Sequence, residues 1–245
     1  MNLNEQLFRI KELIGIKPIN ENINEDKLTR YFQGSEELDE DEVYNTINNN
    51  TSFDIKELVK ITTFKERVNY CNQTLKYIAQ GSSRRVYDLP DGKHVLKLAK
   101  NKKGIAQNEE EYDIGSYPID IIAKVNYTDM LDDNILFVVM EKAEKISEQD
   151  FLKLSGFRLD EFNDICNSKG EYEIFNKFDK YKLDNEIKQS FRDNVLDYIV
   201  SSGLDVYGDL KVLNHWGKVI RDGQPQIVLI DYGLTNDVAK SYYSM

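Results

Sequence analysis

The sequence has few of the features that mark secreted proteins, membrane proteins or metal-binding modules. It contains 2 cysteines, Cys71 and Cys166, whose spacing does not resemble a metal site, so both are expected to be free thiols. No apolar run approaches the length of a membrane span, and the first residues lack the basic start and apolar stretch of a signal peptide. We therefore expect a protein of the reducing cytoplasm with no membrane partner.

Positive charge is also scarce. The 32 lysines and arginines are outnumbered by 43 aspartates and glutamates, which gives a net charge of −11 and a pI near 4.8. Since contacts to a phosphate backbone need clustered lysine and arginine, this balance argues against a nucleic-acid partner. Proline is rare as well, with 4 residues, while Asn, Ile, Lys and Tyr are abundant. That composition fits an AT-rich bacterial or phage coding sequence.

The remaining composition is that of a soluble globular protein whose 245 residues suit one large domain or a domain with an appendage. Residues 1–70 are predicted to form an acidic, mainly helical extension. Apolar residues from Leu3 to Ile14 recur at helical spacing, and another helix is expected to begin near Asp54. The apolar face of the first helix either docks on the main body or binds a protein partner. The acidic run at 35–42 is typical of a solvated face or a linker.

Residues 71–143 change to the alternating pattern of strands. A small-residue turn and an Asp-Gly hairpin signal separate the first three of them, and a helix is expected before the last two. The expected strands are 74–79, 84–89, 94–99, 121–125 and 135–141, and the helix is 104–112.

Two acidic segments near the end of the sequence carry the strongest chemical signal. Asp209 is followed closely by Lys211 and Asn214, and Asp231 follows the apolar run 227–230 and precedes an aromatic residue and a glycine. Phosphoryl transfer needs a carboxylate that orients a hydroxyl nucleophile and oxygen ligands that hold magnesium. These segments therefore indicate a phosphotransferase site, with a structural turn and a capping Asp231 as the alternative interpretation.

The two segments resemble the catalytic loop and the Asp-Phe-Gly segment of protein kinases, and the glycine before Asp209 is closer to aminoglycoside and choline kinases. The resemblance implies that Asp209 is the catalytic aspartate and that Asn214 and Asp231 bind Mg²⁺. It implies that Lys211 neutralises charge on the transferring phosphoryl group. It covers residues 74–233 in the correct order and lacks the later peptide-docking helices of protein kinases.

The strand region resembles the nucleotide-covering lobe of the same family. The family's glycine-rich loop has its counterparts at Ala79, Gly81, Arg84 and Val86, of which Gly81 alone keeps the glycine. Small residues in the loop let the backbone approach phosphates, so Ser82 and Ser83 are also expected to contact the nucleotide. Arg84 and Arg85 are expected to face solvent, and a contact to phosphate is the alternative.

Further positions follow from this resemblance. Lys97 matches the strand lysine that pairs with phosphates and with a helix glutamate, for which Glu111 is favoured and Glu110 is the substitute. An edge-strand lysine that faces solvent is the alternative for Lys97. By the same resemblance Met140 is the gatekeeper, and the backbone of Glu141 to Ala143 contacts the adenine of ATP.

Together these patterns predict an α+β protein with a two-lobed, protein kinase-like fold. It would consist of the extension 1–70, an antiparallel N-lobe sheet within 71–143 and a shortened helical C-lobe within 144–245. Helices are expected at 147–154, 159–165 and 184–202, followed by a hairpin that ends at Asp231.

The function implied is transfer of the γ-phosphoryl group of Mg-ATP to an unidentified hydroxyl acceptor. The alternative is a pseudokinase-like protein that binds nucleotide or serves in an assembly without catalysis. His94 and His215 have no nucleophile or second histidine at a suggestive spacing, so both are expected to be structural.

Overall fold

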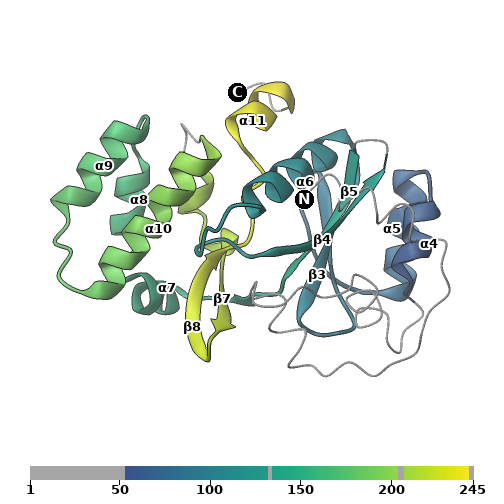
Figure 1. Cartoon of the computed structure of the whole chain (residues 1–245), viewed down its shortest axis with the longest axis horizontal. Helices are drawn as coiled ribbons and strands as arrows, with labels where there is room; N and C mark the ends of the chain where they lie inside the picture. Colours follow the sequence, from purple (N-terminus) through teal and green to yellow (C-terminus); the bar gives the residue numbers. More distant parts are fainter. Residues whose placement is uncertain (1–52, 132–133, 204–206, 243–245) are drawn as a thin grey trace, which may run out of the picture.

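The computed structural model describes residues 53–131, 134–203 and 207–242. A sheet-rich lobe adjoins a helical lobe, which confirms the expected α+β architecture of two lobes (Figure 1). Within these ranges, no helix is long and apolar enough to cross a membrane. The helix expected at 3–14 and the acidic run at 35–42 lie outside the described residues, so a protein partner for that region stays a prediction.

An antiparallel sheet of five strands forms the first lobe, in the order β1-β2-β3-β5-β4. The central position of β3 places Lys97 in the middle of the sheet, between β2 and β5. The strands are β1 (Lys76–Gln80), β2 (Arg84–Asp88), β3 (His94–Ala99), β4 (Val125–Leu131) and β5 (Asn134–Glu141).

The fourth strand begins later than the sequence indicated. The apolar segment Ile121–Ala123 pairs instead with β8 (Gln224–Leu229): the amide of Ala123 donates to the Leu229 carbonyl at 2.9 Å, and the Leu229 amide donates to the Ile121 carbonyl at 2.6 Å. The apolar pattern at 121–123 is therefore explained by a bridge between the lobes.

Three helices pack on the first lobe, namely α4 (Ile55–Lys60), α5 (Phe64–Thr74) and α6 (Lys102–Gly115). Asp54 caps α4 through the amide of Lys56, as its position before an apolar periodicity predicts. The boundary expected after residue 70 falls inside α5. Phe53, Ile55 and Leu58 share one buried cluster with Tyr87, Leu96 and Phe137 of the sheet, so α4 belongs to the same core as the strands.

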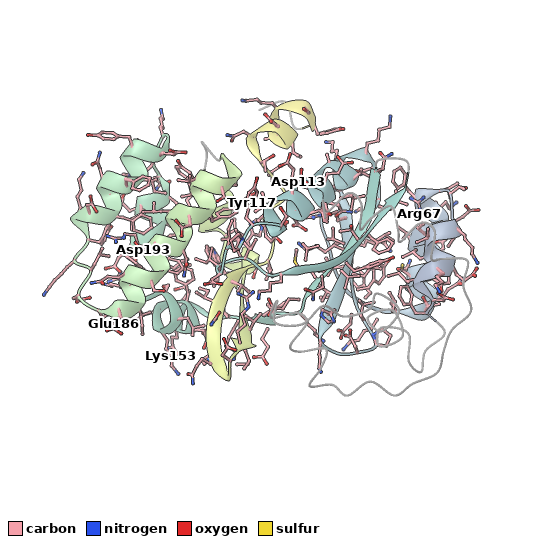
Figure 2. All side chains as sticks on the ribbon, in the orientation of Figure 1. Arg67, Asp113, Tyr117, Lys153, Glu186 and Asp193 are labelled. Carbon is pink, nitrogen blue, oxygen red and sulfur yellow. The ribbon has the colours of Figure 1, made fainter. Side chains whose placement is uncertain are left out.

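The second lobe contains α7 (Glu148–Ser155), α8 (Leu159–Cys166), α9 (Glu171–Lys180) and α10 (Glu186–Ser202). Its centre is a set of four rings, Phe151, Phe162, Phe191 and Trp216, whose centroids lie 5.3–5.8 Å apart. Charged side chains face outward, as the exposed Lys153, Glu186 and Asp193 do in Figure 2. The sequence analysis did not predict α9.

A small sheet of β6 (Glu144–Lys145), β7 (Trp216–Arg221) and β8 connects the helical lobe to the segment that carries Asp231. The β7–β8 turn has positive φ at Asp222 and Gly223, 51° and 72°, as a two-residue hairpin requires. After Asp231 the chain returns to the first lobe, where α11 (Asn236–Tyr242) lies beside α6 (Figure 1).

Candidate active site

Lys97 of β3 and Glu111 of α6 form a buried ion pair. The Lys97 Nζ lies 2.7 Å from Glu111 Oε1 and donates a second bond of 2.6 Å to the carbonyl of Ile230. Leaving an ammonium unpaired inside a protein is costly, so the pair stabilises both the lysine and the glutamate. Burial raises the pKa of Glu110, and nearby Thr235 opposes that shift. Of the two candidates, the structure therefore places Glu111 at Lys97.

The segment after β8 packs directly on α6, and a glycine is required there. A Cβ on Gly233 would lie 2.3 Å from the carbonyl oxygen of Gln107 and 3.1 Å from Glu111 Cγ. The neighbouring Tyr232 is buried, and its hydroxyl donates to the carbonyl of Ala123 at 2.8 Å. These two contacts explain the aromatic-glycine sequence, and they hold Asp231 beside the Lys97–Glu111 pair.

Arg84 lies inside the site, and the expectation that it faces solvent is wrong. Its Nη2 contacts Asp231 Oδ1 at 2.5 Å and Glu111 Oε1 at 3.0 Å. Its Nη1 lies 2.8 Å from Glu111 Oε2, a contact that is ionic because it lacks hydrogen-bond geometry. The first residue of β2 points toward α6, so the guanidinium reaches two carboxylates that a solvent-facing side chain would not meet.

The four groups form a balanced cluster, in which the cations Lys97 and Arg84 face the anions Glu111 and Asp231. Burial lowers the pKa of Lys97. Burial acts in the same direction on Arg84, but the charges of Glu111 and Asp231 outweigh it and raise the pKa of Arg84. Burial acts to raise the pKa of Asp231, but the charges of Arg84 and Lys97 outweigh it and hold that pKa below its usual range. The Asp231 side chain is 45% exposed, so protein atoms crowd one side of the carboxylate and solvent reaches the other.

Asp209 lies in a short 3-10 turn, η1 (Asp209–Lys211), whose position is fixed by the indole of Trp216. The indole N–H donates to the carbonyl of Leu210 at 2.7 Å. Burial raises the pKa of Asp209; nearby His215 opposes this shift and Asp231 adds to it. The turn therefore holds a partly exposed carboxylate that accepts a proton more readily than a free aspartate does.

His215 connects the two acids, a role that the sequence analysis missed. Its Nδ1 lies 3.9 Å from Asp209 Oδ1, and its Nε2 lies 3.9 Å from Asp231 Oδ2. The Nδ1 also bonds to the backbone carbonyl of Asp209 at 3.0 Å. The available signal was that His215 directly follows Asn214. By contrast His94 is structural, because its Nδ1 pairs with Asp91 Oδ2 at 2.6 Å within a turn.

Two predicted residues of the catalytic loop lie apart from the buried cluster. The Lys211 Nζ donates to Asn167 Oδ1 at 2.9 Å, at the end of α8. The lysine is thus directed toward the helical lobe and not toward Asp231. Asn214 is exposed in the second 3-10 turn, η2 (Leu213–His215).

The turn between β1 and β2 is fastened to the start of α6. The Ser83 hydroxyl is buried against Gln107, and the Ser83 carbonyl accepts from the amide of Lys100 at 2.8 Å. The Lys100 Nζ donates to the carbonyl of Gly81 at 2.6 Å. A Cβ on Gly104 would lie 2.4 Å from the Ser83 oxygen, so this close packing requires glycine. In this arrangement the Ser83 hydroxyl is used within the protein.

The other predicted nucleotide contacts lie on the strands that flank the site. Ala79 is exposed on the edge strand β1, while Val86 lies directly opposite Lys97 in the β2–β3 register. Met140 is buried near the end of β5. The amide of Glu141 donates to the Lys124 carbonyl at 2.8 Å.

The segment after β5 is also partly committed to internal bonds. The amide of Lys142 donates to the Lys93 carbonyl at 2.9 Å. The carboxylate of Glu141 binds Arg221 at 2.6 Å, which ties the strand end to β7. Ala143 packs closely on Gly217, where an added Cβ would lie 2.6 Å from the Ala143 Cβ.

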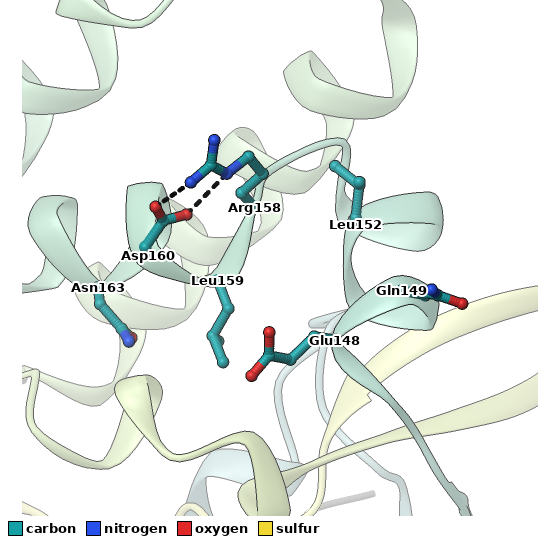
Figure 3. Close-up of a pocket in the computed structure, with 7 residues that line it drawn as sticks. All are labelled: Glu148, Gln149, Leu152, Arg158, Leu159, Asp160 and Asn163. Atoms are coloured by element: carbon teal, nitrogen blue, oxygen red, sulfur yellow. Dashed lines mark hydrogen bonds and ion pairs between the residues drawn. The ribbon is translucent and has the colours of Figure 1, made fainter.

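A separate hollow lies between α7 and α8 in the helical lobe (Figure 3). An ion pair of Arg158 and Asp160 lies along its edge. Its lining contains none of the residues predicted from the sequence to act on a nucleotide, and consists of Glu148, Gln149, Leu152, Arg158, Leu159, Asp160 and Asn163.

The arrangement does not fit a magnesium ion on Asn214 and Asp231. One oxygen of Asp231 already contacts a guanidinium, and the charges of the buried cluster already cancel. The described ranges contain no group of three His, Cys, Asp or Glu side chains that could hold a metal ion. Since Mg²⁺ binds through carboxylate oxygens and water, a neutralised carboxylate is a poor ligand for it.

No family model and no curated protein matches the sequence. Similar solved structures include a GDP complex of a mutant aminoglycoside 2′-phosphotransferase-IIIa, with 13% identity, a TM-score of 0.29, and coverage of 61% of this chain and 42% of the other. The chain thus spans less than half of that enzyme.

Two further structures are complexes of the aminoglycoside phosphotransferase APH(2″)-IIa. The gentamicin complex has 16% identity and a TM-score of 0.31, covering 82% of this chain and 71% of the other. The streptomycin–ATP complex has 17% identity and a TM-score of 0.29, covering 69% and 70%. Structural similarity at these TM-scores carries no argument about function.

Proposed function

We propose that the protein binds a nucleoside triphosphate beside Lys97 and Asp231 and transfers its γ-phosphoryl group to a hydroxyl acceptor. The observation that carries the proposal is the convergence of Lys97, Glu111, Asp231 and Asp209 from four distant segments. The first three share one buried cluster, and His215 lies 3.9 Å from both Asp231 and Asp209.

Asp209 is the proposed proton acceptor. Its partial exposure leaves room for a substrate, and its raised pKa suits a group that accepts the proton of a hydroxyl as the oxygen attacks. A new bond forms between the acceptor oxygen and the γ-phosphorus, the bond to the nucleoside diphosphate breaks, and the proton passes to Asp209. An unidentified hydroxyl compound serves as acceptor.

Positive charge for the transferring phosphoryl group comes from the chain itself in this proposal. Lys97 and Arg84 both contact Glu111, and Arg84 also contacts Asp231; fixed cations stabilise the charge that develops in phosphoryl transfer. Lys211 would assist after leaving Asn167. No step is assigned to a metal ion, because Asp231 is already neutralised.

The base of the nucleotide is proposed to lie against Val86, Met140 and the segment Glu141–Ala143. The amides of Glu141 and Lys142 are used within the protein, so a hydrogen bond that this segment donates to the base would come from the Ala143 amide. Ala79, Gly81, Ser82 and Ser83 would cover the phosphates through backbone atoms, because the Ser83 hydroxyl is bonded to Gln107.

Turnover of γ-labelled ATP tests the proposal, with release of labelled phosphate to water as the minimal reaction. Asp209→Asn keeps the shape of the side chain and is expected to lower turnover about 100-fold or more. Asp205→Asn is a control that removes an acid from the same stretch of sequence. Nucleotide binding without turnover in the wild type would contradict catalysis.

The second candidate is a nucleotide-binding protein without transfer. The contact of 2.5 Å between Arg84 and Asp231 favours it, because that acid is then unavailable to a catalytic metal. Binding measured by calorimetry, together with wild-type turnover no higher than that of Asp209→Asn, would establish this candidate.

A further inference from the structure

Arg84 changes the charge that a bound nucleotide would meet at Asp231. A triphosphate carries several negative charges, and Asp231 would repel it if the acid were unpaired. A divalent cation usually bridges such an acid to the phosphates. Here a side chain of the protein lies at the acid, with Arg84 Nη2 at 2.5 Å from Asp231 Oδ1.

Three structural features hold Arg84 at this place. Its side chain is 7% exposed and contacts Glu111, which is fully buried. Nη1 bonds to Asn108 Oδ1 at 3.4 Å, and Asn108 is anchored in turn to the carbonyl of Ile135 at 3.1 Å. The preceding residue, Ser83, is fastened to α6 through Gln107. These contacts hold the guanidinium in a fixed position within the site.

The charges of the cluster also determine whether a cation is attracted to Asp231. Without Arg84, the group of Lys97, Glu111 and Asp231 would carry one excess negative charge, which attracts a cation. With Arg84 the positive and negative charges of these four groups are equal, and a divalent ion would add two positive charges beside a guanidinium. Asp209, which lies beyond His215, is outside this count.

We propose that the Arg84 guanidinium takes the place of a divalent cation at Asp231, so that this site binds the phosphates of a nucleotide without a metal ion. The inference rests on the proposed nucleotide site. It assigns to Arg84 a positioning and neutralising role: the arginine cancels the charge of Asp231 and leaves the exposed side of that carboxylate open to the phosphates.

The test is a calorimetric titration of the whole chain with ATP, once in excess EDTA and once in excess Mg²⁺. The dissociation constants of the wild type are expected to agree within about threefold. Arg84→Gln removes the charge and is expected to weaken binding in EDTA by about tenfold or more, equivalent to ~1.4 kcal/mol. Magnesium should restore that loss, because Asp231 is then free to bind the ion.

Arg85→Gln is the matched control, since this neighbouring arginine contacts Asn72 and Tyr77 on the other side of the strand. It should leave both dissociation constants within about twofold of the wild type. If Arg84→Gln does not fold, Arg84→Lys keeps the charge at the acid, and it should retain binding in EDTA.

The outcomes separate the inference from the proposed function. Wild-type binding that requires Mg²⁺ would overturn the inference and leave the nucleotide site standing. Equal binding of ATP by the wild type and Arg84→Gln in EDTA would overturn the role of Arg84. Absence of binding in both conditions would overturn the inference and the nucleotide site together.

Discussion

The two halves of the candidate site differ in how completely their charges are paired. The buried half, Lys97, Arg84, Glu111 and Asp231, is a closed set in which each group has a partner of opposite charge. The other half is centred on Asp209, whose side chain is partly exposed. His215 lies between the two halves, 3.9 Å from Asp209 and from Asp231. The paired charges therefore support the fold, while the solvent-facing sides of Asp231 and Asp209 remain available to a substrate.

The largest loss of stability is expected when the charge of Glu111 is removed. Glu111→Gln would leave two buried cations with one remaining anion, so we expect the free energy of unfolding to fall by ~3–5 kcal/mol. Urea denaturation measures the change. Glu110→Gln is the matched control on the same helix and should cost less than about 1 kcal/mol, because Glu110 is only half-buried. Equal losses for both variants would contradict the closed cluster.

A smaller loss is expected from Gly233→Ala. The added methyl group would meet the Gln107 carbonyl at 2.3 Å and push the Asp231 segment away from α6. Overpacking of this kind costs ~1–3 kcal/mol. Gly208→Ala, one residue before Asp209, has no atom within 4 Å of the new Cβ and should change thermal stability little. A stable Gly233→Ala with unchanged nucleotide binding would argue against this packing.

The pH dependence of stability should have opposite signs in the two halves. Asp231 has a lowered pKa, so its ionised form contributes stability above about pH 4, which is lost as the pH falls through the folded-state pKa. Asp209 has a raised pKa, so its contribution is present below about pH 4 and is lost as the pH rises through the folded-state pKa. Both effects are reduced by solvent, because both side chains are more than one-third exposed.

Urea denaturation of Asp231→Asn and Asp209→Asn across that range separates the two signs. The cost of Asp231→Asn should shrink as the solution is acidified. Asp209→Asn should become more favourable relative to the wild type as the pH rises. Parallel pH profiles for the two variants would show that both acids belong to one environment.

The smallest effect is expected at His215. His215 opposes the upward shift of the Asp209 pKa, so His215→Gln should raise that pKa further. A carboxyl-carbon NMR titration measures the shift directly. A lowered Asp209 pKa in this variant would contradict the placement of His215 between the two acids.

Four of the five expected strands followed patterns that local sequence can carry, and the pairing of Lys97 with Glu111 followed from the resemblance to kinases. Alternating apolar residues and an Asp-Gly turn mark strands, and a lysine flanked by apolar residues within a strand must find a buried partner. Successive helix residues point in different directions, so at most one of the neighbouring glutamates could face Lys97; Glu111 was favoured and Glu110 kept as the substitute.

The position of Arg84 could not be predicted in this way. An arginine at the start of a strand is ordinarily exposed, and its two carboxylate partners, Glu111 and Asp231, lie 27 and 147 residues away. The contact depends on how the turn before β2 is fastened to α6. His215 was missed for a related reason: only the folded chain brings it close to both Asp209 and Asp231.

The central claim is tested most directly by a crystal structure with a non-hydrolysable ATP analogue and manganese, with anomalous scattering used to locate the metal. We predict phosphates on the exposed side of Asp231, Arg84 still bound to that acid, and no manganese on Asp231 or Asn214. Manganese bound to Asp231 with Arg84 displaced, or phosphates bound away from Lys97, would contradict the account.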